Sequence, residues 1–500
     1  MPVINKAYHV GTDDAALFNN NACFCIGTGR MGLALQQEYM DQLKKVQKEI
    51  GFSHIRGHGL FCDDMAIYHP YTDENGVTYE QYNFTYLDRV MDGYLSCGLK
   101  PFLELGFMPK KMASGEQTIF YWQGNTTPPA DHEKWALLIK ALLHHLIERY
   151  GREEVETWPV EVWNEPNLPG FWKDADQQAY LKLYDVSVRA VKEVLPKMRV
   201  GGPAVCGGAS CMPWLKAFLD HCRDEKVAVD FLTRHIYMGQ TPSHKGRYLY
   251  HEMCDPAYSL GEAEETRKLV DSYPEFKGME IHITEFNTSY NPFCPTHDTV
   301  YNAALIAGLL AGLGDTCASY SYWTFGDVFE EVGVPDRPFH GGFGLLANNS
   351  IPKPTYWTFE FFSRLKGNAL LKTDDCVLIR NDRGGYQAVL WNLEKEEKKI
   401  SFTLPETAGK WTAICRTVDE KSGNPLKIWH DMGEPCSLTA DQKNLLLECA
   451  RPRVESIQVD AGGDGLKADF ALAPNAVVYL EITCPSSGFS YGYQYPGCGI

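Results

Sequence analysis

Long apolar runs are absent from this 500-residue chain, and no stretch approaches the roughly 18 uninterrupted apolar residues of a membrane-spanning helix. We therefore expect no membrane partner. Basic side chains are also in the minority, with 47 Lys and Arg against 64 Asp and Glu and a net charge of −17. This charge argues against nucleic acid and anionic membrane surfaces as partners.

No Cys-x-x-Cys pair occurs, although 16 cysteines are scattered from Cys23 to Cys498. The spacing of Cys206, Cys211 and Cys222 fits no common metal site. The first ten residues also lack a basic stretch followed by an apolar run, so no secretory signal is expected. These absences predict reduced thiols in a cytoplasmic protein, with no metal site.

Residues 22–325 alternate short apolar runs with longer segments of helical pattern. The strands are predicted at residues 24–26, 53–56, 101–105, 158–163, 199–202, 231–236, 281–283 and 318–323. Helices are predicted at residues 35–50, 135–150 and 178–194, where Gly51, Gly151 and Pro196 supply the stop signals. Eight strands with intervening helices favour an α/β fold, the (β/α)8 TIM barrel.

The pattern changes after about Pro354 to short, turn-punctuated runs that are typical of an antiparallel β-sandwich. We predict a catalytic barrel over residues 22–355 and an accessory C-terminal β-sandwich over 356–485. Residues 1–21 form an N-terminal segment that can add a strand to the β domain. Residues 486–500 form a Gly- and Tyr-rich tail suited to packing on a surface, such as that of a neighbouring subunit.

Two glutamates follow strand-like runs about 120 positions apart, Glu165 in Trp-Asn-Glu-Pro and Glu285 in Ile-Thr-Glu-Phe. Both positions are at the carboxyl end of a predicted strand, where a β/α barrel carries its reactive groups. A carboxyl group against an aromatic wall has a raised pKa, which suits Glu165 to acid/base catalysis. Glu285 is then the nucleophile, and Asn164 can bind a sugar 2-OH. The pair predicts cleavage of a glycosidic bond; a non-catalytic carbohydrate-binding protein would not need both glutamates.

Further polar and aromatic residues fall at predicted strand ends. His58 and His235, each close to an arginine, are expected to bind sugar hydroxyls or hold the carboxylates. Trp323 follows the eighth strand, where its ring can stack on a sugar or pack inside the barrel. Glu330 and Glu331 lie in the next loop, either as acceptors for sugar hydroxyls or as solvated charges.

The run Gly27-Thr28-Gly29-Arg30-Met31-Gly32 matches the dinucleotide-binding pattern after a strand-like run. It supports a remote alternative, a nicotinamide-dependent dehydrogenase. The acid that should follow about 20 residues later at a strand end is missing, because only Glu49 is available and it lies in a Lys-rich helical stretch. A tight turn after the first barrel strand explains the glycines equally well.

Several stretches together resemble glycoside hydrolase family 39, the β-xylosidase family of barrel hydrolases with catalytic glutamates on strands four and seven. The matching stretches are Gly27 to Arg30, Arg56 to Leu60, Gly106 to Lys110, Trp163 to Asn167, Ser319 to Phe325 and Phe339 to Gly344. They cover most of residues 22–355. Departures lie in residues 71–82 and in the tail.

The resemblance implies a retaining mechanism with Glu165 as acid/base and Glu285 as nucleophile. It implies sugar contacts from His58, Asn164, His235, Tyr237, Tyr290, Trp323 and one of Glu330 or Glu331. We expect an exo-acting β-xylosidase that releases xylose from the non-reducing end of xylo-oligosaccharides without cofactor or metal, as a homo-oligomer. The alternatives within the family are an iduronidase, which needs cationic groups for a sugar carboxylate, or an arabinosidase.

Overall fold

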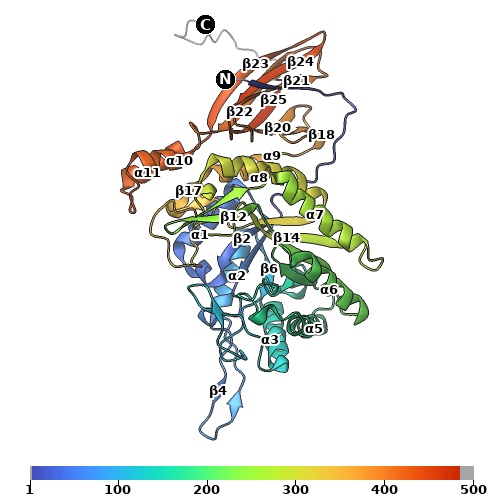
Figure 1. The fold of residues 1–500 in the computed structure, drawn as a ribbon, viewed down its shortest axis with the longest axis vertical. Coiled ribbons are helices and arrows are strands. Elements are labelled where there is room, and N and C mark those ends of the chain that lie inside the picture. Colours follow the sequence, from blue (N-terminus) through green and yellow to red (C-terminus); the bar gives the residue numbers. More distant parts are fainter. Residues whose placement is uncertain (1–2, 485–500) are drawn as a thin grey trace.

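The computed structural model of the protein describes residues 3–484. Eight parallel strands close a barrel in the order β10-β11-β14-β15-β2-β3-β6-β9 (Figure 1). Their bounds are β2 Cys25–Arg30, β3 His54–His58, β6 Lys100–Leu105, β9 Val160–Val162, β10 Val200–Val205, β11 Phe231–Tyr237, β14 Glu280–Asn287 and β15 Ser319–Tyr322. Each of the eight predicted runs coincides with one of these strands, so the predicted parallel barrel is confirmed.

Helices surround the barrel between successive strands. They are α1 Gln37–Glu49, α2 Thr85–Ser96, α3 His132–Tyr150, the short α4 Arg152–Val155, α5 Gln177–Val194, α6 Cys211–Asp224, α7 Pro256–Asp271, α8 Val300–Gly312 and α9 Pro354–Arg364. Capping residues decide where they begin: the side chain of Asp131 accepts a hydrogen bond from the first turn of α3, and Asp176 does the same for α5. Helix α3 ends at Gly151, whose φ of +86° a residue with a side chain would adopt only at a cost.

A nine-stranded sheet contains the C-terminal part of the chain (orange to red in Figure 1) and has the order β1-β21-β24-β23-β22-β25-β20-β19-β18. Its strands are β1 Val3–His9, β18 Asn368–Lys372, β19 Cys376–Arg380, β20 Tyr386–Trp391, β21 Glu397–Leu404, β22 Lys410–Val418, β23 Arg453–Gly462, β24 Gly465–Leu472 and β25 Val477–Thr483. Strand β1 pairs in parallel with β21, which fixes the beginning of the chain to this distant sheet. The tail predicted to pack on a surface lies outside the described residues.

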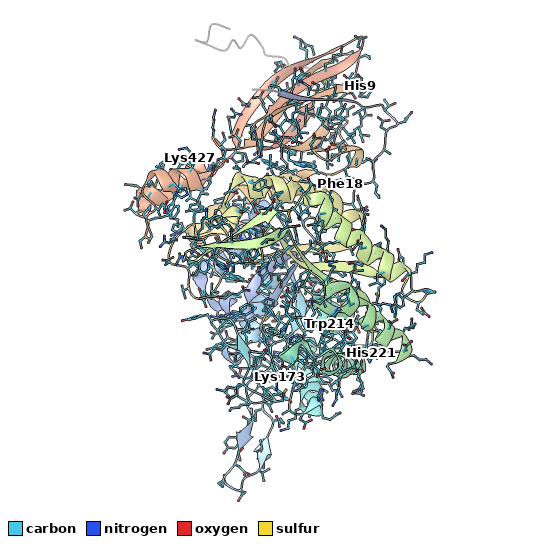
Figure 2. The ribbon with its side chains drawn as sticks, viewed as in Figure 1. His9, Phe18, Lys173, Trp214, His221 and Lys427 are labelled. Atoms are coloured by element: carbon cyan, nitrogen blue, oxygen red, sulfur yellow. The ribbon has the colours of Figure 1, made fainter. Side chains whose placement is uncertain are left out.

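Helices α8 and α9 lie between the barrel and this sheet (Figure 1). Nearly every residue of α8 is buried, because one side of the helix packs on the barrel and another contacts β20 and β25. A helix that is apolar on all sides is stable only in such a position. The segment that follows β1 returns along the same side, and the ring of Phe18 lies 6.4 Å from that of Phe362 in α9 (Figure 2).

Two helices that the sequence patterns did not reveal, α10 Pro425–Asp431 and α11 Ala440–Cys449, are inserted between β22 and β23. Trp429 of α10 and Leu446 of α11 are buried in a small apolar cluster with Phe339 and Ile351 from the barrel loops. Short amphipathic helices of this length give a weak periodic signal, and their stability depends on this packing.

The glycine run that suggested dinucleotide binding has a packing role. Gly27 and Gly29 lie in β2, and Gly32 lies in the short helical turn that follows it. A Cβ atom at Gly27 would come within 2.7 Å of the Trp323 ring, and one at Gly29 within 2.8 Å of Phe329. Because this run is the first strand of a closed barrel and not of an open doubly wound sheet, it does not form the dinucleotide-binding turn on which the dehydrogenase alternative depended.

Several loops of the barrel contain short two-stranded hairpins. They are β4 Tyr71–Thr72 with β5 Thr78–Tyr79, β7 Thr118–Ile119 with β8 Gly124–Asn125, β12 Gly239–Lys245 with β13 Tyr248–Met253, and β16 Leu346–Ala347 with β17 Ile351–Pro352. The β4–β5 hairpin extends away from the body of the molecule (Figure 1). Among the described residues, none of the helices has the length and apolar character needed to cross a membrane.

Candidate active site

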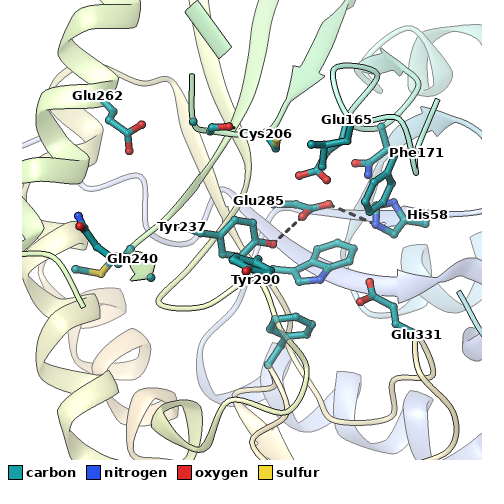
Figure 3. A pocket seen from close by; sticks show the side chains of 18 of the residues that line it. His58, Glu165, Phe171, Cys206, Tyr237, Gln240, Glu262, Glu285, Tyr290 and Glu331 are labelled. Carbon is teal, nitrogen blue, oxygen red and sulfur yellow. Dashed lines mark hydrogen bonds and ion pairs between the residues drawn. The ribbon is translucent and has the colours of Figure 1, made fainter. Parts of the chain in front are cut away.

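A cavity of about 690 Å³ opens at the carboxyl ends of the barrel strands (Figure 3). Its lining comes from the residues at or just after the ends of β3, β9, β10, β11, β14 and β15, and from α7. Parallel strands place the side chains at their carboxyl ends around one opening, so residues far apart in the sequence converge here.

Glu165 and Glu285 both line this cavity (Figure 3). Glu165 follows β9 and Glu285 lies within β14; they are 7% and 4% exposed. One oxygen of each carboxyl group lies within 4.8 Å of one of the other. Two carboxyl groups about 5 Å apart can act on opposite faces of one acetal carbon, one as nucleophile and the other as proton donor.

The loop that carries Glu165 has strained backbone. Trp163 and Glu165 have φ values of +71° and +46°, in the left-handed region that residues other than glycine rarely adopt. Packing compensates for the strain: the Trp163 indole N–H donates a 2.8 Å hydrogen bond to the Phe171 carbonyl, and its ring contacts Trp172 edge-on at 5.0 Å. Such strain is found where the surrounding structure fixes a functional side chain.

Glu285 receives donors on both carboxylate oxygens. Arg56 Nη1 donates to Oε1 at 2.5 Å. The Tyr237 hydroxyl donates to Oε2 at 2.7 Å, and His58 Nε2 lies 3.4 Å from Oε1 (Figure 3). Donors on both oxygens hold the carboxyl group in one orientation.

Glu165 has a different environment. The one hydrogen-bond partner of its carboxyl group among the described residues is His235, whose Nδ1 lies 2.8 Å from Oε1. Burial and the nearby charge of Glu285 raise the pKa of Glu165 well above its usual value. Burial, together with Arg56, lowers the pKa of His235, so that its imidazole is neutral. Glu165 therefore holds its proton more firmly than an ordinary glutamate does, as the acid in acid/base chemistry requires.

A buried ionic network lies directly beneath the pair. Arg56 donates through Nε and Nη2 to Glu161 Oε2 at 2.9 and 2.6 Å, and through Nη2 to the Asn164 side chain at 2.8 Å. Glu104 Oε2 lies 2.8 Å from the same Nη2 atom. Burial disfavours the Arg56 cation, but the carboxylates around it raise its pKa above the usual value. The positive charge of Arg56 thus compensates the charges of several buried carboxyl groups, including that of Glu285.

His58 connects one of these acids to the cavity. Its Nδ1 lies 2.7 Å from Glu104 Oε2 while the opposite nitrogen faces Glu285. Burial opposes ionisation of Glu104, yet His58 and Arg56 hold its pKa below the ordinary value. Burial raises the pKa of Glu161, although Arg56 and the Thr284 hydroxyl partly offset this effect. Neither Glu104 nor Glu161 was predicted as a site residue from the sequence, although an acid inside an apolar strand run is a usable signal.

The remaining predicted residues divide into those that face the cavity and those that do not. His58, Asn164, Tyr237, Tyr290, Trp323 and Glu331 line it together with the two glutamates. His235 is fully buried behind Glu165. Glu330 pairs with Arg30 at 2.6 Å and accepts a hydrogen bond from Gln36 outside the cavity. Of the two neighbouring candidates, the structure therefore brings Glu331 to the cavity.

Glu331 has an unusual protonation behaviour. Burial, followed by the charges of Glu285 and Glu165, raises its pKa well above the usual value. In its neutral form the carboxyl group can both donate and accept a hydrogen bond. A hydroxylated ring beside Trp323 could use both properties.

Further residues of the cavity wall were not predicted from the sequence. They are Phe171, Cys206, Gln240, Tyr258, Glu262 and Phe343. They come from loops and from α7, whose positions depend on tertiary packing. Within the described part of the chain, the lining contains neither lysine nor arginine, but it contains four glutamates. The cavity is therefore suited to a neutral, hydroxyl-rich ligand with one or more aromatic contacts.

Comparisons with known proteins agree with this geometry. The family model described as Glycosyl hydrolases family 39 matches residues 13–465. A β-xylosidase of Geobacillus stearothermophilus is 46% identical over 486 residues, 95% of each chain, and one of Caldicellulosiruptor saccharolyticus is 34% identical over 92% of this chain and 94% of its own. The crystal structure of a monomeric β-xylosidase from Caulobacter crescentus CB15 superposes with a TM-score of 0.86 at 32% identity, covering 96% of this chain and all of that one.

Proposed function

Because the chain belongs to glycosyl hydrolases family 39, a membership already indicated by its sequence, we propose that it is a retaining β-xylosidase. It releases xylose from the non-reducing end of short β-1,4-xylo-oligosaccharides. The observation that carries the proposal is the pair of buried carboxyl groups within 4.8 Å of each other, one rich in donors and the other with a raised pKa.

The first step is displacement of the leaving sugar. A carboxylate oxygen of Glu285 attacks the anomeric carbon while the protonated Glu165 gives its proton to the glycosidic oxygen. The C–O bond to the leaving sugar breaks, and a covalent xylosyl ester forms on Glu285. Arg56 and Tyr237 orient the attacking carboxylate, and they stabilise it again when it leaves.

The second step reverses the roles. Glu165, now ionised, takes a proton from water, and the water oxygen attacks the anomeric carbon as the bond to Glu285 breaks. Two inversions give net retention. His235 holds Glu165 in place for both transfers and remains neutral, so it does not add a fixed positive charge that would keep Glu165 ionised.

The sugar ring is held by groups around the pair. Asn164 receives a hydrogen bond from Arg56 on its amide oxygen, which leaves its N–H₂ group free to donate to the 2-hydroxyl. Glu331 can bind two hydroxyl groups, and the Trp323 ring forms a wall beside His58, with ring centroids 4.7 Å apart. Tyr290, which is half exposed, is placed to contact the leaving sugar at the mouth.

The charge of the cavity favours a neutral pentose over a uronic acid. An iduronidase must bind a sugar carboxylate, but the described lining offers glutamates and no cationic side chain apart from histidine. Arg56 is not available for this role because carboxylates already surround it.

Three further properties belong to the same proposal. The two halves of the nine-stranded sheet share one apolar core, with Phe402 and Phe470 on one side and Leu390 and Leu480 on the other, which supports a β-sandwich. It would be an accessory domain beside the catalytic barrel.

We also propose that the enzyme acts in the cytoplasm, because short oligomers can be imported whereas polymeric xylan cannot. We further propose that it assembles into a homo-oligomer.

A panel of nitrophenyl glycosides tests the sugar preference, and xylohexaose labelled at its reducing end tests exo action. We expect the β-xyloside to have the highest kcat/KM and xylohexaose to give unlabelled xylose and labelled xylopentaose as the first products, whereas internal cleavage would give xylobiose, xylotriose and xylotetraose. NMR during turnover should show the β-anomer of xylose before mutarotation. Initial appearance of the α-anomer, or a preference for an iduronide, would contradict the proposal. Cell fractionation and light scattering test location and subunit number.

A further inference from the structure

Glu165, Glu285 and His235 form a cluster with the spacing of metal ligands. Within residues 3–484 it is the one group of three acidic, histidine or cysteine side chains whose ligand atoms all lie within 4.8 Å of one another, and all three are buried. We propose that this cluster binds a zinc ion, and that zinc is a competitive inhibitor of the enzyme. The inhibition rests on the proposed function, whereas zinc binding does not.

The distances fit a three-ligand zinc site after small side-chain movements. His235 Nδ1 lies 2.8 Å from Glu165 Oε1 and 3.5 Å from Glu285 Oε2. Zinc bonds of about 2.0–2.2 Å place neighbouring ligand atoms of a tetrahedron roughly 3.3–3.5 Å apart. Nδ1 of His235 and Oε1 of Glu165 must therefore separate by about half an ångström. The carboxylate oxygens of Glu165 and Glu285 must approach each other.

The neighbouring donors leave one side of Glu285 open to a cation. Arg56 and His58 both face Oε1, whereas Oε2 faces His235 and the hydroxyl group of Tyr237. A cation bound at Oε2 is thus on the opposite side of the carboxylate from the guanidinium group. Over the described residues, the cavity lining offers no lysine or arginine that would repel it further.

The donor set selects the kind of metal. When zinc displaces the proton of Glu165, the two carboxylates neutralise the divalent charge. The neutral imidazole of His235 favours zinc and copper over magnesium and calcium, which prefer oxygen ligands. A zinc ion at this position occupies the space between the two carboxyl groups. The anomeric carbon of the bound substrate must occupy the same space. Zinc and the sugar therefore cannot bind at the same time.

Isothermal titration of zinc chloride into the intact protein, without substrate, tests the site directly. We expect one site on the wild-type protein and no response to magnesium chloride. The variants Glu165→Gln and Glu285→Gln keep the side-chain shape but lose a strong ligand, and each should weaken zinc binding about 10-fold or more. Thermal unfolding of each variant checks that it is folded. His430→Ala removes an exposed His–Glu pair far from the cavity and is the matched control, with unchanged zinc affinity.

Steady-state kinetics with an aryl xyloside tests the inhibition. Zinc should raise KM without changing kcat, and a chelator should restore the original rate. Zinc affinity that is unaltered in both glutamine variants, or that Cys206→Ser alone abolishes, would overturn the proposed site. Zinc binding in a protein that hydrolyses no xyloside would refute the proposed function but support the zinc site. Xyloside hydrolysis without zinc binding would refute the zinc site but support the proposed function.

Discussion

His58 Nδ1 lies 2.7 Å from Oε2 of the buried Glu104. The other ring nitrogen faces the proposed nucleophile, Glu285, at 3.4 Å. The imidazole ring thus joins Glu104, which does not line the cavity, to Glu285, which does. A change at Glu104 therefore alters how His58 is held against Glu285. We regard Glu104 as a positioning residue.

Glu104→Gln should therefore lower kcat/KM without touching the cavity wall. Loss of a hydrogen bond to a charged group costs about 1.5–3 kcal/mol, which corresponds to roughly a 10- to 150-fold decrease. We also expect a shifted acidic limb of the pH–rate profile, which a purely structural defect would not produce. Glu280→Gln is the matched control, since Glu280 pairs with Arg199 at the opposite end of the barrel. Equal effects of the two variants would contradict the role of Glu104.

Glu285→Ala should abolish turnover, because no covalent intermediate can form. We expect a decrease in kcat of about 10⁴-fold or more on an aryl β-xyloside. Azide can occupy the space left by the carboxylate and attack the anomeric carbon once, so activity should return with α-xylosyl azide as the product. Proton NMR of the product identifies the anomer. A β-azide would transfer the nucleophile role to another residue.

Glu165→Ala should discriminate between leaving groups. An aryloxide with a low pKa departs without a proton, whereas an alcohol needs one, so xylobiose should lose about 10²- to 10⁴-fold in kcat/KM while an activated aryl xyloside loses far less. Azide should here give the β-azide, the opposite anomer to that expected for Glu285→Ala. If both substrates are affected equally, Glu165 is not the general acid.

The pH dependence of the wild-type enzyme follows from the same residue. Burial and the charge of Glu285 raise the pKa of Glu165, and its protonated form is the one that donates. Activity should therefore persist above the usual titration range of a glutamate and fall as the pH rises through the raised pKa. This basic limb in kcat/KM should disappear in Glu165→Ala with an activated substrate. A limb that survives the substitution would belong to another group.

Lys353 is expected to be important for stability. Its Nζ lies 2.6 Å from both Asp298 Oδ1 and Asp327 Oδ2, and all three side chains are buried. Lys353→Met would leave two carboxylates without a cation, which should lower the free energy of unfolding by about 3–5 kcal/mol. Lys399→Met breaks an exposed pair with Asp469 and should change it by no more than about 1 kcal/mol. Urea unfolding monitored by tryptophan fluorescence measures both.

The sequence predicted the barrel and the positions of Glu165 and Glu285 because alternating strands and helices fix where strand ends meet. It could not choose between Glu330 and Glu331, since adjacent loop residues point in directions that only the packed loop determines. Glu104 and Glu161 were not predicted as site residues, because a single acid within an apolar strand run only interrupts the apolar pattern and does not by itself indicate a role. Helices α10 and α11 were missed for a similar reason, as their burial comes from distant residues of the barrel loops.

The location of α8 and α9 has a consequence for anyone who wishes to shorten this chain. Both helices bury apolar side chains against β20 or β25, so deleting everything after Arg364 would expose a broad apolar surface on an otherwise intact barrel. A truncated protein of this kind should aggregate on expression. The sheet through β25, which ends at Thr483, should therefore be kept, and insertions are better placed in the projecting β4–β5 hairpin.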